Sequence, residues 1–201
     1  MFALVLSGTN TYDGTTAVNA WMLVVSGNQS AANGAVTIAS GATLAGEGTI
    51  GGATTVSGTH APGDGGVGTQ AVSGTLTYNS GSIFEWNVTS DSSYDKVTGI
   101  SSLSGSGGIF NVVETNIASG FWDDPQTFPS VFNTGTLNSV FSSFQFNGAA
   151  LTDGVVPGQG TFTFNGSSEQ WTPIPELSNL LIGGPLGAGR RRATASPNVE
   201  G

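Results

Sequence analysis

The sequence predicts an all-β fold: a parallel β-helix, or solenoid, followed by an aromatic-rich C-terminal β section or cap and a short hydrophobic tail. Three observations predict it. Glycine supplies 32 of the 201 residues, and charged residues supply only 8%, far below the ~25% of ordinary globular domains. Apolar residues recur two positions apart between glycines, which indicates short strands rather than helices. Similar blocks also follow one another along the chain, which is the signature of a repeat architecture.

The blocks are equal in length and start at Ala17, Ala35, Ala53 and Ala71. One such coil buries about four aliphatic side chains, each worth roughly 1.5–3 kcal/mol, while ordering its backbone costs about 1–2 kcal/mol per residue. A single coil is therefore unstable, and the repeat predicts a stack in which neighbouring coils share one core. The alternating residues expected to face that core are Val36, Ile38, Leu44, Ile50 and Val56.

Glycines are expected at the corners of the coils, where the backbone needs a positive φ or approaches its neighbour closely. A flexible linker would also be rich in glycine, but it would not carry alternating Val, Ile and Leu between the glycines. The corner glycines predicted in this way are Gly8, Gly14, Gly27, Gly34, Gly41, Gly46, Gly48, Gly51 and Gly58.

The composition changes after residue 80, so we assign residues 1–80 to the solenoid repeats and 81–172 to the C-terminal section. Nine of the 11 Phe lie between Phe110 and Phe164. Large aromatic rings bury more area per residue and suit a cap over the open end of a sheet. Alternation persists in four groups: Phe84, Trp86 and Val88; Ile109, Asn111 and Val113; Phe144 and Phe146; Phe162 and Phe164.

The chain changes again at residues 173–192. Two prolines break any strand there, and an apolar run follows from residue 177 to residue 189. As a helix these residues would span about 20 Å, short of the ~30 Å hydrocarbon core of a bilayer, and Pro185 interrupts them. We expect a marginal membrane segment here and a disordered tail over residues 193–201.

Charge and cysteine content exclude several functions. Residues 1–189 contain 12 acidic residues and a single basic one, Lys96, so they cannot neutralise the phosphates of a nucleic acid. The absence of Cys removes disulfides, thiolate catalysis and Cys-ligated metals. Phe2 to Leu6 are apolar, but this run is too short for a signal peptide and no basic residue precedes it. We therefore expect the chain to start inside a longer repeat protein or to lack its upstream export signal.

Residues 6–52 resemble the autotransporter-associated β-strand repeat. This resemblance implies a right-handed β-helical stalk of the kind found in secreted passenger proteins. One departure concerns Trp21 and Met22, which stand where the family has Gly-Thr, at a turn. The matching positions are Leu6, Gly8, Asn10, Thr11, Tyr12, Gly14, Thr16, Val18, Ala20, Leu23, Gly41, Ala42, Leu44, Gly46, Gly48, Ile50, Gly51 and Gly52.

The C-terminal segment is similar to a degenerate PEP-CTERM sorting signal, which consists of Pro-Glu-Pro, an apolar helix and an Arg-rich end. Leu177 replaces the second proline, and nine residues follow the arginines. The resemblance implies recognition by an exosortase-type membrane enzyme, followed by release or attachment at the cell surface. An ordinary disordered tail is the alternative. The sorting-signal residues are Pro175, Glu176, Arg190, Arg191 and Arg192.

We predict no catalytic, cofactor-binding or metal-ligating residues. His60 is the single histidine, and with Ser57 and Asp64 it suggests a triad, but no nucleophile elbow is present and a turn is favoured. Asp123 and Asp124 could bind a cation or act in a glycosidase, but adjacent residues on one loop do not span a cleft. We expect them in a turn or cap.

Two further motifs have plain structural interpretations. Residues 65–70 approach the calcium-binding Gly-Gly-x-Gly-x-Asp repeat, but Gln70 replaces the Asp ligand and only one copy is present, so a turn is favoured. Trp86 or Trp122 could stack on sugars, although we expect both rings in the core.

These features favour an exported, cell-surface or secreted structural or adhesin-like protein without catalytic activity. Extracellular polysaccharide is an expected type of partner, and the oligomeric state is left open. One alternative is a polysaccharide lyase or hydrolase on a β-helix, which rests on fold analogy alone. The other alternative is a lectin-like carbohydrate-binding module that uses exposed aromatic residues.

Overall fold

The computed structural model describes residues 2–175, and the regular structure within them is almost entirely β. Its 21 strands form four sheets, and its two helical segments are single 3-10 turns, η1 (Phe121–Asp123) and η2 (Leu137–Ser139). Over these residues, no helix is both long enough and apolar enough to cross a membrane. The predicted all-β class is confirmed.

Three of the sheets are built from parallel strands, which we call sheets A, B and C. Sheet A contains β1 (Ala3–Leu6), β3 (Trp21–Val25), β6 (Ala42–Gly46), β9 (Thr59–Pro62), β12 (Ile83–Val88), β15 (Gly108–Glu114), β17 (Phe141–Phe146) and β18 (Ala149–Leu151). Sheet B contains β2 (Thr16–Val18), β5 (Val36–Ile38), β8 (Thr54–Val56), β11 (Thr75–Tyr78) and β14 (Ser102–Gly105). Sheet C contains β4 (Asn28–Gln29), β7 (Thr49–Ile50), β10 (Thr69–Val72) and β13 (Lys96–Thr98).

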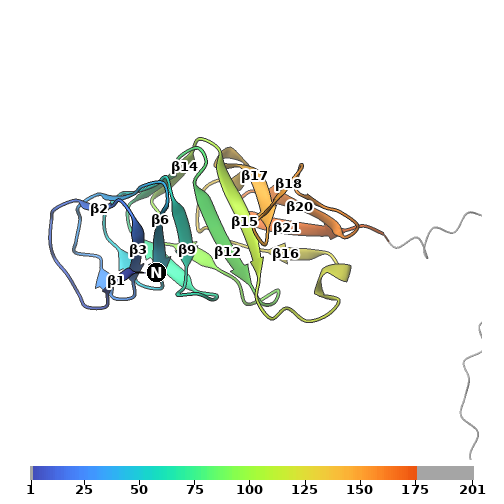
Figure 1. Cartoon of the computed structure of the whole chain (residues 1–201), viewed down its shortest axis with the longest axis horizontal. Helices are drawn as coiled ribbons and strands as arrows, with labels where there is room; N and C mark the ends of the chain where they lie inside the picture. The colour runs from blue at the N-terminus through green and yellow to red at the C-terminus, as the bar shows by residue number, and fades with distance from the viewer. Residues whose placement is uncertain (1, 176–201) are drawn as a thin grey trace, which may run out of the picture.

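The chain visits the three sheets in a fixed order. After each of the first four strands of sheet B it adds one strand to sheet A and one to sheet C, and then returns to sheet B one level further along. Neighbouring strands are parallel except at the end of sheet A, where β17 and β18 pair antiparallel. Figure 1 shows the strands of sheet A side by side along the long axis of the molecule. This topology is consistent with a β-helix.

Strand registers align one side chain per coil into an interior column along sheet A. Aliphatic side chains form its first part and aromatic rings its last part, with His60 between them. The core members from Leu23 to Phe110 are fully or almost fully buried, and each buried apolar side chain contributes roughly 1.5–3 kcal/mol. The column consists of Leu4, Leu23, Leu44, His60, Phe84, Phe110 and Phe144.

The aliphatic core was predicted correctly, but the constant period was wrong. All five alternating residues expected in the first coils are buried. Val36 pairs with Thr54, one block length away as predicted, but Thr54 pairs with Leu76 and Leu76 with Leu103, so the sequence spacing between paired strands of sheet B grows from Val36 onward. The predicted boundary between the third and fourth blocks was wrong, because the loop 63–68 lengthens the third coil. Ala71 therefore lies in sheet C rather than at the start of a block.

Glycines allow neighbouring coils to approach closely at their corners. A Cβ added to Gly27 would overlap the backbone of Gly8, and a Cβ added to Gly48 would overlap the backbone of Gly27, so these residues form a column in which no other side chain fits. Gly8 and Gly14 meet no such neighbour and have no positive φ. The corner glycines that do have a close neighbour or a positive φ are Gly27, Gly34, Gly41, Gly46, Gly48, Gly51 and Gly58.

Trp21 adopts a backbone conformation that glycine usually occupies. Its φ is +67°, in the left-handed region that bulky residues rarely adopt, and its side chain is 57% exposed. The ring of Phe2 contacts it edge to face at a centroid distance of 5.3 Å.

Aromatic rings fill the coils from β11 onward. Phe84 and Trp86 face the core as predicted, and both are completely buried. On β15 the fully buried side chains are Phe110 and Val112, whereas the alternation seen in the sequence runs through Ile109, Asn111 and Val113. The register explains this difference, since Phe84 pairs with Phe110 and the column continues through these two rings.

The fourth sheet, sheet D, is antiparallel and lies at the C-terminal end of the described chain (Figure 1). It packs on the last coils through aromatic contacts such as Phe110 with Phe164, at 5.2 Å between ring centroids. The parallel sheets themselves continue beyond residue 80 as far as β17. The strands of sheet D are β16 (Gln126–Phe128), β19 (Val155–Val156), β20 (Gly160–Asn165) and β21 (Ser168–Pro173).

Of the predicted sorting signal, the structure describes only Pro175, which is exposed and follows the end of β21. Glu176 and the three arginines, residues 190–192, lie outside the described residues, as do the apolar run and the tail over 193–201.

Candidate ligand-binding cleft

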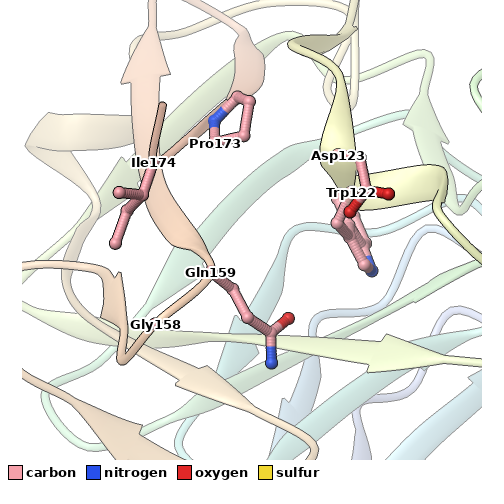
Figure 2. A pocket seen from close by; sticks show the side chains of 6 residues that line it. All are labelled: Trp122, Asp123, Gly158, Gln159, Pro173 and Ile174. Carbon is pink, nitrogen blue, oxygen red and sulfur yellow. The ribbon is translucent and has the colours of Figure 1, made fainter. Parts of the chain in front are cut away.

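A cleft opens where the loop after β15 meets the edge of sheet D. It consists of two adjoining hollows that share Trp122, Asp123 and Gln159. One hollow continues toward the end of β21, and the other continues along the loop from Glu114. Figure 2 shows Trp122 and Asp123 on one side, Pro173 and Ile174 on the other, and Gln159 below them. The cavity volume of the first hollow is about 210 Å³, which is smaller than the ~300–1,000 Å³ of typical small-molecule pockets.

The Trp122 wall of the cleft is fixed by hydrogen bonds. The Trp122 indole nitrogen donates to one carboxylate oxygen of Glu114, and the Asn147 side-chain amide donates to the other oxygen at 2.9 Å. The Trp171 indole nitrogen donates to the Trp122 backbone carbonyl at 2.7 Å. Both oxygens of Glu114 are thus engaged in structure, and the loop is tied to sheets A and D at once.

The opposite wall is fixed by the backbone. The turn between β19 and β20 closes when the Gln159 backbone N–H donates to the Val156 carbonyl at 3.1 Å. The Gln159 carbonyl in turn accepts the N–H of Ile174 at 2.8 Å, which holds the end of β21 beside the turn. Because both walls are tied to sheets, the shape of the cleft is preorganised.

Two polar side chains remain available in this cleft. Asp123 and Gln159 are exposed, and within residues 2–175 no hydrogen-bond partner is found for either side chain. Ile174 is 51% exposed and adds an apolar surface beside them. The cleft therefore offers a carboxylate acceptor, an amide that both donates and accepts, and an apolar wall.

The expected turn at Asp123 and Asp124 is confirmed. Asp123 is the last residue of η1, and Asp124 caps its C-terminal end in an extended conformation. Gln159, Pro173 and Ile174 were not predicted as site residues, because they come from a turn and a strand end far along the chain from η1. Trp122 and Trp86 are buried as predicted, at 9% and 0% exposure.

The electrostatics of the cleft disfavour anions. Lys96 is the single basic side chain of residues 2–175 apart from His60, and its ammonium lies 4.6 Å from the centre of the Tyr94 ring. In the same part of the chain, no group of three or more His, Asp, Glu or Cys side chains could hold a metal ion. No described residue can therefore pair with an acidic ligand in the cleft.

The turn predicted at His60 was wrong: this residue lies on β9 and is completely buried. Its Nε2 lies 2.8 Å from Gln70 Oε1, while the Gln70 amide nitrogen donates to the carbonyls of Ala45 and Gly46. Because Gln70 Oε1 can only accept, His60 Nε2 carries the proton. His60 Nδ1 then accepts the Tyr78 hydroxyl at 2.5 Å.

This network also shows that no triad forms. Both ring nitrogens of His60 are engaged in the core, Asp64 is exposed, and the Ser57 hydroxyl accepts a hydrogen bond from Asn79 instead. Burial lowers the pKa of His60 to about 4, so the ring is neutral. Gln70 was expected in a turn, but it lies on β10 and fixes the His60 tautomer.

Two other carboxyl groups are buried in the core. Asp95 accepts the backbone N–H groups of Gly68 and Asn87 at 2.7 and 2.8 Å, yet burial raises its pKa to about 7. Glu169 on β21 has no hydrogen-bond partner for either oxygen, and burial raises its pKa well above the usual range. Both residues are sealed from solvent, so they belong to the core and not to the cleft.

Comparison with known proteins gives one partial match. A stretch of 54 residues, 27% of this chain, is 50% identical to the adhesin BmaC autotransporter of Brucella suis biovar 1 (strain 1330). The matched stretch covers 2% of that adhesin, so this chain corresponds to a small part of its length. No protein-family model matches the chain. The match makes the chain similar over that stretch to an autotransporter adhesin, a cell-surface protein.

Proposed function

We propose that this chain is a right-handed β-helical, adhesin-like structural protein that is exported to the cell surface or the medium and has no catalytic activity. In this proposal the stacked coils act as a rigid spacer, and ligands are bound rather than transformed. The sequence match to an autotransporter adhesin supports this role.

The observation that carries the proposal is the shared core of successive coils. The interior column continues from β3 to β15 without a break, so each coil is stabilised by the coils on either side. Such a stack makes a stiff, elongated body whose length grows with the number of coils. An adhesin uses a body of this kind to hold binding surfaces away from the membrane.

The proposal includes sorting through the C-terminal segment. Recognition of a PEP-CTERM-like signal by an exosortase-type enzyme requires an accessible peptide after the folded body. Pro175 is exposed just beyond the end of β21, which supports the accessibility of the start of this segment. The apolar run that follows would associate with the membrane while the enzyme acts.

Fractionation of native cells tests export. An antibody against residues 20–170 should detect the protein at the cell surface or in the medium, and protease added to intact cells should remove the surface signal. A cytosolic marker must survive the same protease treatment. Recovery of the protein only in the cytosol would end the proposal. Replacing all three arginines, residues 190–192, with Ala should trap the protein before surface release if sorting depends on them.

A polysaccharide panel tests the absence of catalysis. The purified protein should release no reducing ends or unsaturated products from any polysaccharide. Turnover that disappears in Asp123→Ala or Asp124→Ala would instead favour the enzyme alternative, because these are the free carboxylates nearest the cleft.

A further inference from the structure

The cleft between the η1 loop and sheet D has the chemistry of a site for a neutral, hydroxyl-rich ligand. We infer that Asp123 and Gln159 bind an uncharged oligosaccharide there, with Pro173 and Ile174 contacting its apolar face. This inference rests on the proposed surface function and adds a ligand class and a place where the ligand binds.

The first argument is that the site is built before the ligand arrives. Glu114 fixes the Trp122 indole, and Trp171 holds the Trp122 carbonyl. Across the cleft, the hydrogen bond between Ile174 and Gln159 holds the turn against β21. A preformed shape lowers the entropic cost of binding, which is needed where the ligand offers only hydroxyl groups and a small apolar area.

The second argument concerns the polar groups that remain free. Asp123 can accept two hydroxyl hydrogen bonds, and the Gln159 amide can donate to one hydroxyl while it accepts from another. Figure 2 shows the two side chains on different sides of the same space, so one ligand can contact both. Neighbouring hydroxyl groups on a sugar ring present this alternation of donors and acceptors.

The third argument is charge. Asp123 and Glu114 line the cleft, and within residues 2–175 Lys96 is the sole lysine or arginine. An acidic sugar would meet a carboxylate without a compensating cation, which is unfavourable. A metal ion would find one free carboxylate, because both oxygens of Glu114 already accept hydrogen bonds. A neutral ligand is what remains.

The fourth argument is the apolar wall. Ile174 is half exposed and lies with Pro173 beside the polar groups. One face of a pyranose ring carries mainly C–H groups and can pack on such a surface while the hydroxyl groups at its edge reach Asp123 and Gln159. A ligand without an apolar face would leave this wall hydrated.

Calorimetric titration of the full 201-residue chain tests the inference. The probes are cellohexaose and mannohexaose as neutral ligands and a galacturonate hexamer as the acidic one. We expect at least one neutral probe to bind with a dissociation constant of about 1 mM or tighter and the acidic probe to bind at least tenfold more weakly. EDTA should leave binding unchanged. Calcium-dependent binding, or preference for the acidic probe, would overturn the inference.

Variants locate the site. Asp123→Asn keeps the shape of the side chain and should weaken binding about tenfold, and Asp123→Ala combined with Gln159→Ala should abolish it. Asp91→Ala, which changes an exposed carboxylate that lines neither hollow, is the matched control and should bind like the parent chain. Circular dichroism of each variant establishes that the fold is retained. Binding that survives the double variant would place the ligand elsewhere.

The outcomes separate this inference from the proposed function. If neither neutral probe binds but the protein is found at the cell surface, the glycan site is refuted and the surface role stands. If a neutral probe binds at the cleft but the protein stays in the cytosol, the ligand class stands and the surface role is refuted.

Discussion

The first coils and the last coils solve the same packing problem with different side chains. Around Leu44 the core is aliphatic, and glycine columns let the backbone of one coil touch the next. Around Trp86 and Phe110 the core is aromatic, and ring centroids lie 4.8–5.6 Å apart. A coil with a narrow interior packs by bringing its backbone close to that of the next coil, whereas a coil with a wide interior is filled by large side chains.

Coil length follows the same division. Val36 and its partner Thr54, in the first coils, are much closer in sequence than Leu76 and its partner Leu103, in the last coils. Additional residues enclose a wider interior, and only rings of the size of Phe or Trp fill it without voids. A short repeat therefore selects Gly, Val and Leu, and a long repeat selects aromatic residues.

The largest expected effect comes from truncating the aromatic core. Trp86 is completely buried and donates its indole N–H to the Asp95 carbonyl at 3.0 Å. Trp86→Ala should lower the free energy of unfolding by about 3–5 kcal/mol, because it leaves a large cavity among rigid rings. Leu44→Ala should cost about 2–3 kcal/mol, since small neighbours can collapse around it. Urea denaturation followed by circular dichroism measures both, and equal losses would contradict the distinction.

The two polar groups at the boundary between the regions should give opposite pH dependences. His60 has a pKa of about 4 in the folded chain, against 6.5 when unfolded, so its contribution to stability is lost as the pH falls from 6.5 to 4. Asp95 has a pKa of about 7, against 3.8, so its contribution is lost as the pH rises from 3.8 to 7. Across its range the effect amounts to about 3 kcal/mol for His60 and about 4 kcal/mol for Asp95.

Single variants separate the contributions of the two groups to the pH dependence of the unfolding free energy. The difference in unfolding free energy between His60→Gln and the parent chain should change by about 3 kcal/mol between pH 4 and pH 6.5. For Asp95→Asn the difference should change by a similar amount in the opposite direction. Urea titrations at four pH values suffice. A difference that does not vary with pH for either variant would mean that the group titrates alike in both states.

Local sequence pattern accounts for the success of the prediction in the first coils. Where glycines bound three- to five-residue strands, as around Val36 and Leu44, every residue that the alternation assigned to the core is buried. The local pattern failed at His60, because a histidine between Thr59 and Ala61 gives no local sign that Gln70 and Tyr78 satisfy both its nitrogens. Such satisfaction depends on partners in the neighbouring strands.

Only one wall of the cleft could be predicted from the sequence, again because the other wall depends on residues that are distant along the chain. Asp123 was recognised as a turn residue beside Trp122, but Gln159 comes from another sheet. Nothing in a single sequence relates the turn at 157–160 to the loop at 115–125. On β15 the alternation of Ile109, Asn111 and Val113 was recognised, but this pattern does not reveal that Phe110 and Val112 are fully buried.

The next largest loss of stability is expected from a substitution in the glycine column of the first coils, where neighbouring backbones approach closely. Gly48→Ala places a methyl group against the backbone of Gly27, and forcing the two coils apart should cost about 1–3 kcal/mol. Gly8→Ala is the matched control at the start of the same column, because a methyl group there meets nothing. Its stability should stay within about 0.5 kcal/mol of the parent chain. If both variants lost the same stability, the glycine column would have no packing role.

The smallest effect concerns Trp21, whose positive φ strains the corner of the second coil. Trp21→Gly and Trp21→Ala both lose the contact with the Phe2 ring, but only glycine relieves the left-handed backbone, which costs other residues about 1–2 kcal/mol. The glycine variant should therefore be more stable than the alanine variant by about 1 kcal/mol. Ala17→Gly is the control at an ordinary strand position, in the extended and exposed middle of β2. Glycine should be less favourable than alanine there and should lower the free energy of unfolding by about 0.5–1 kcal/mol. If the alanine and glycine variants were equally stable, the backbone at position 21 would relax out of the left-handed conformation. The packing of the first coils would then not depend on that conformation.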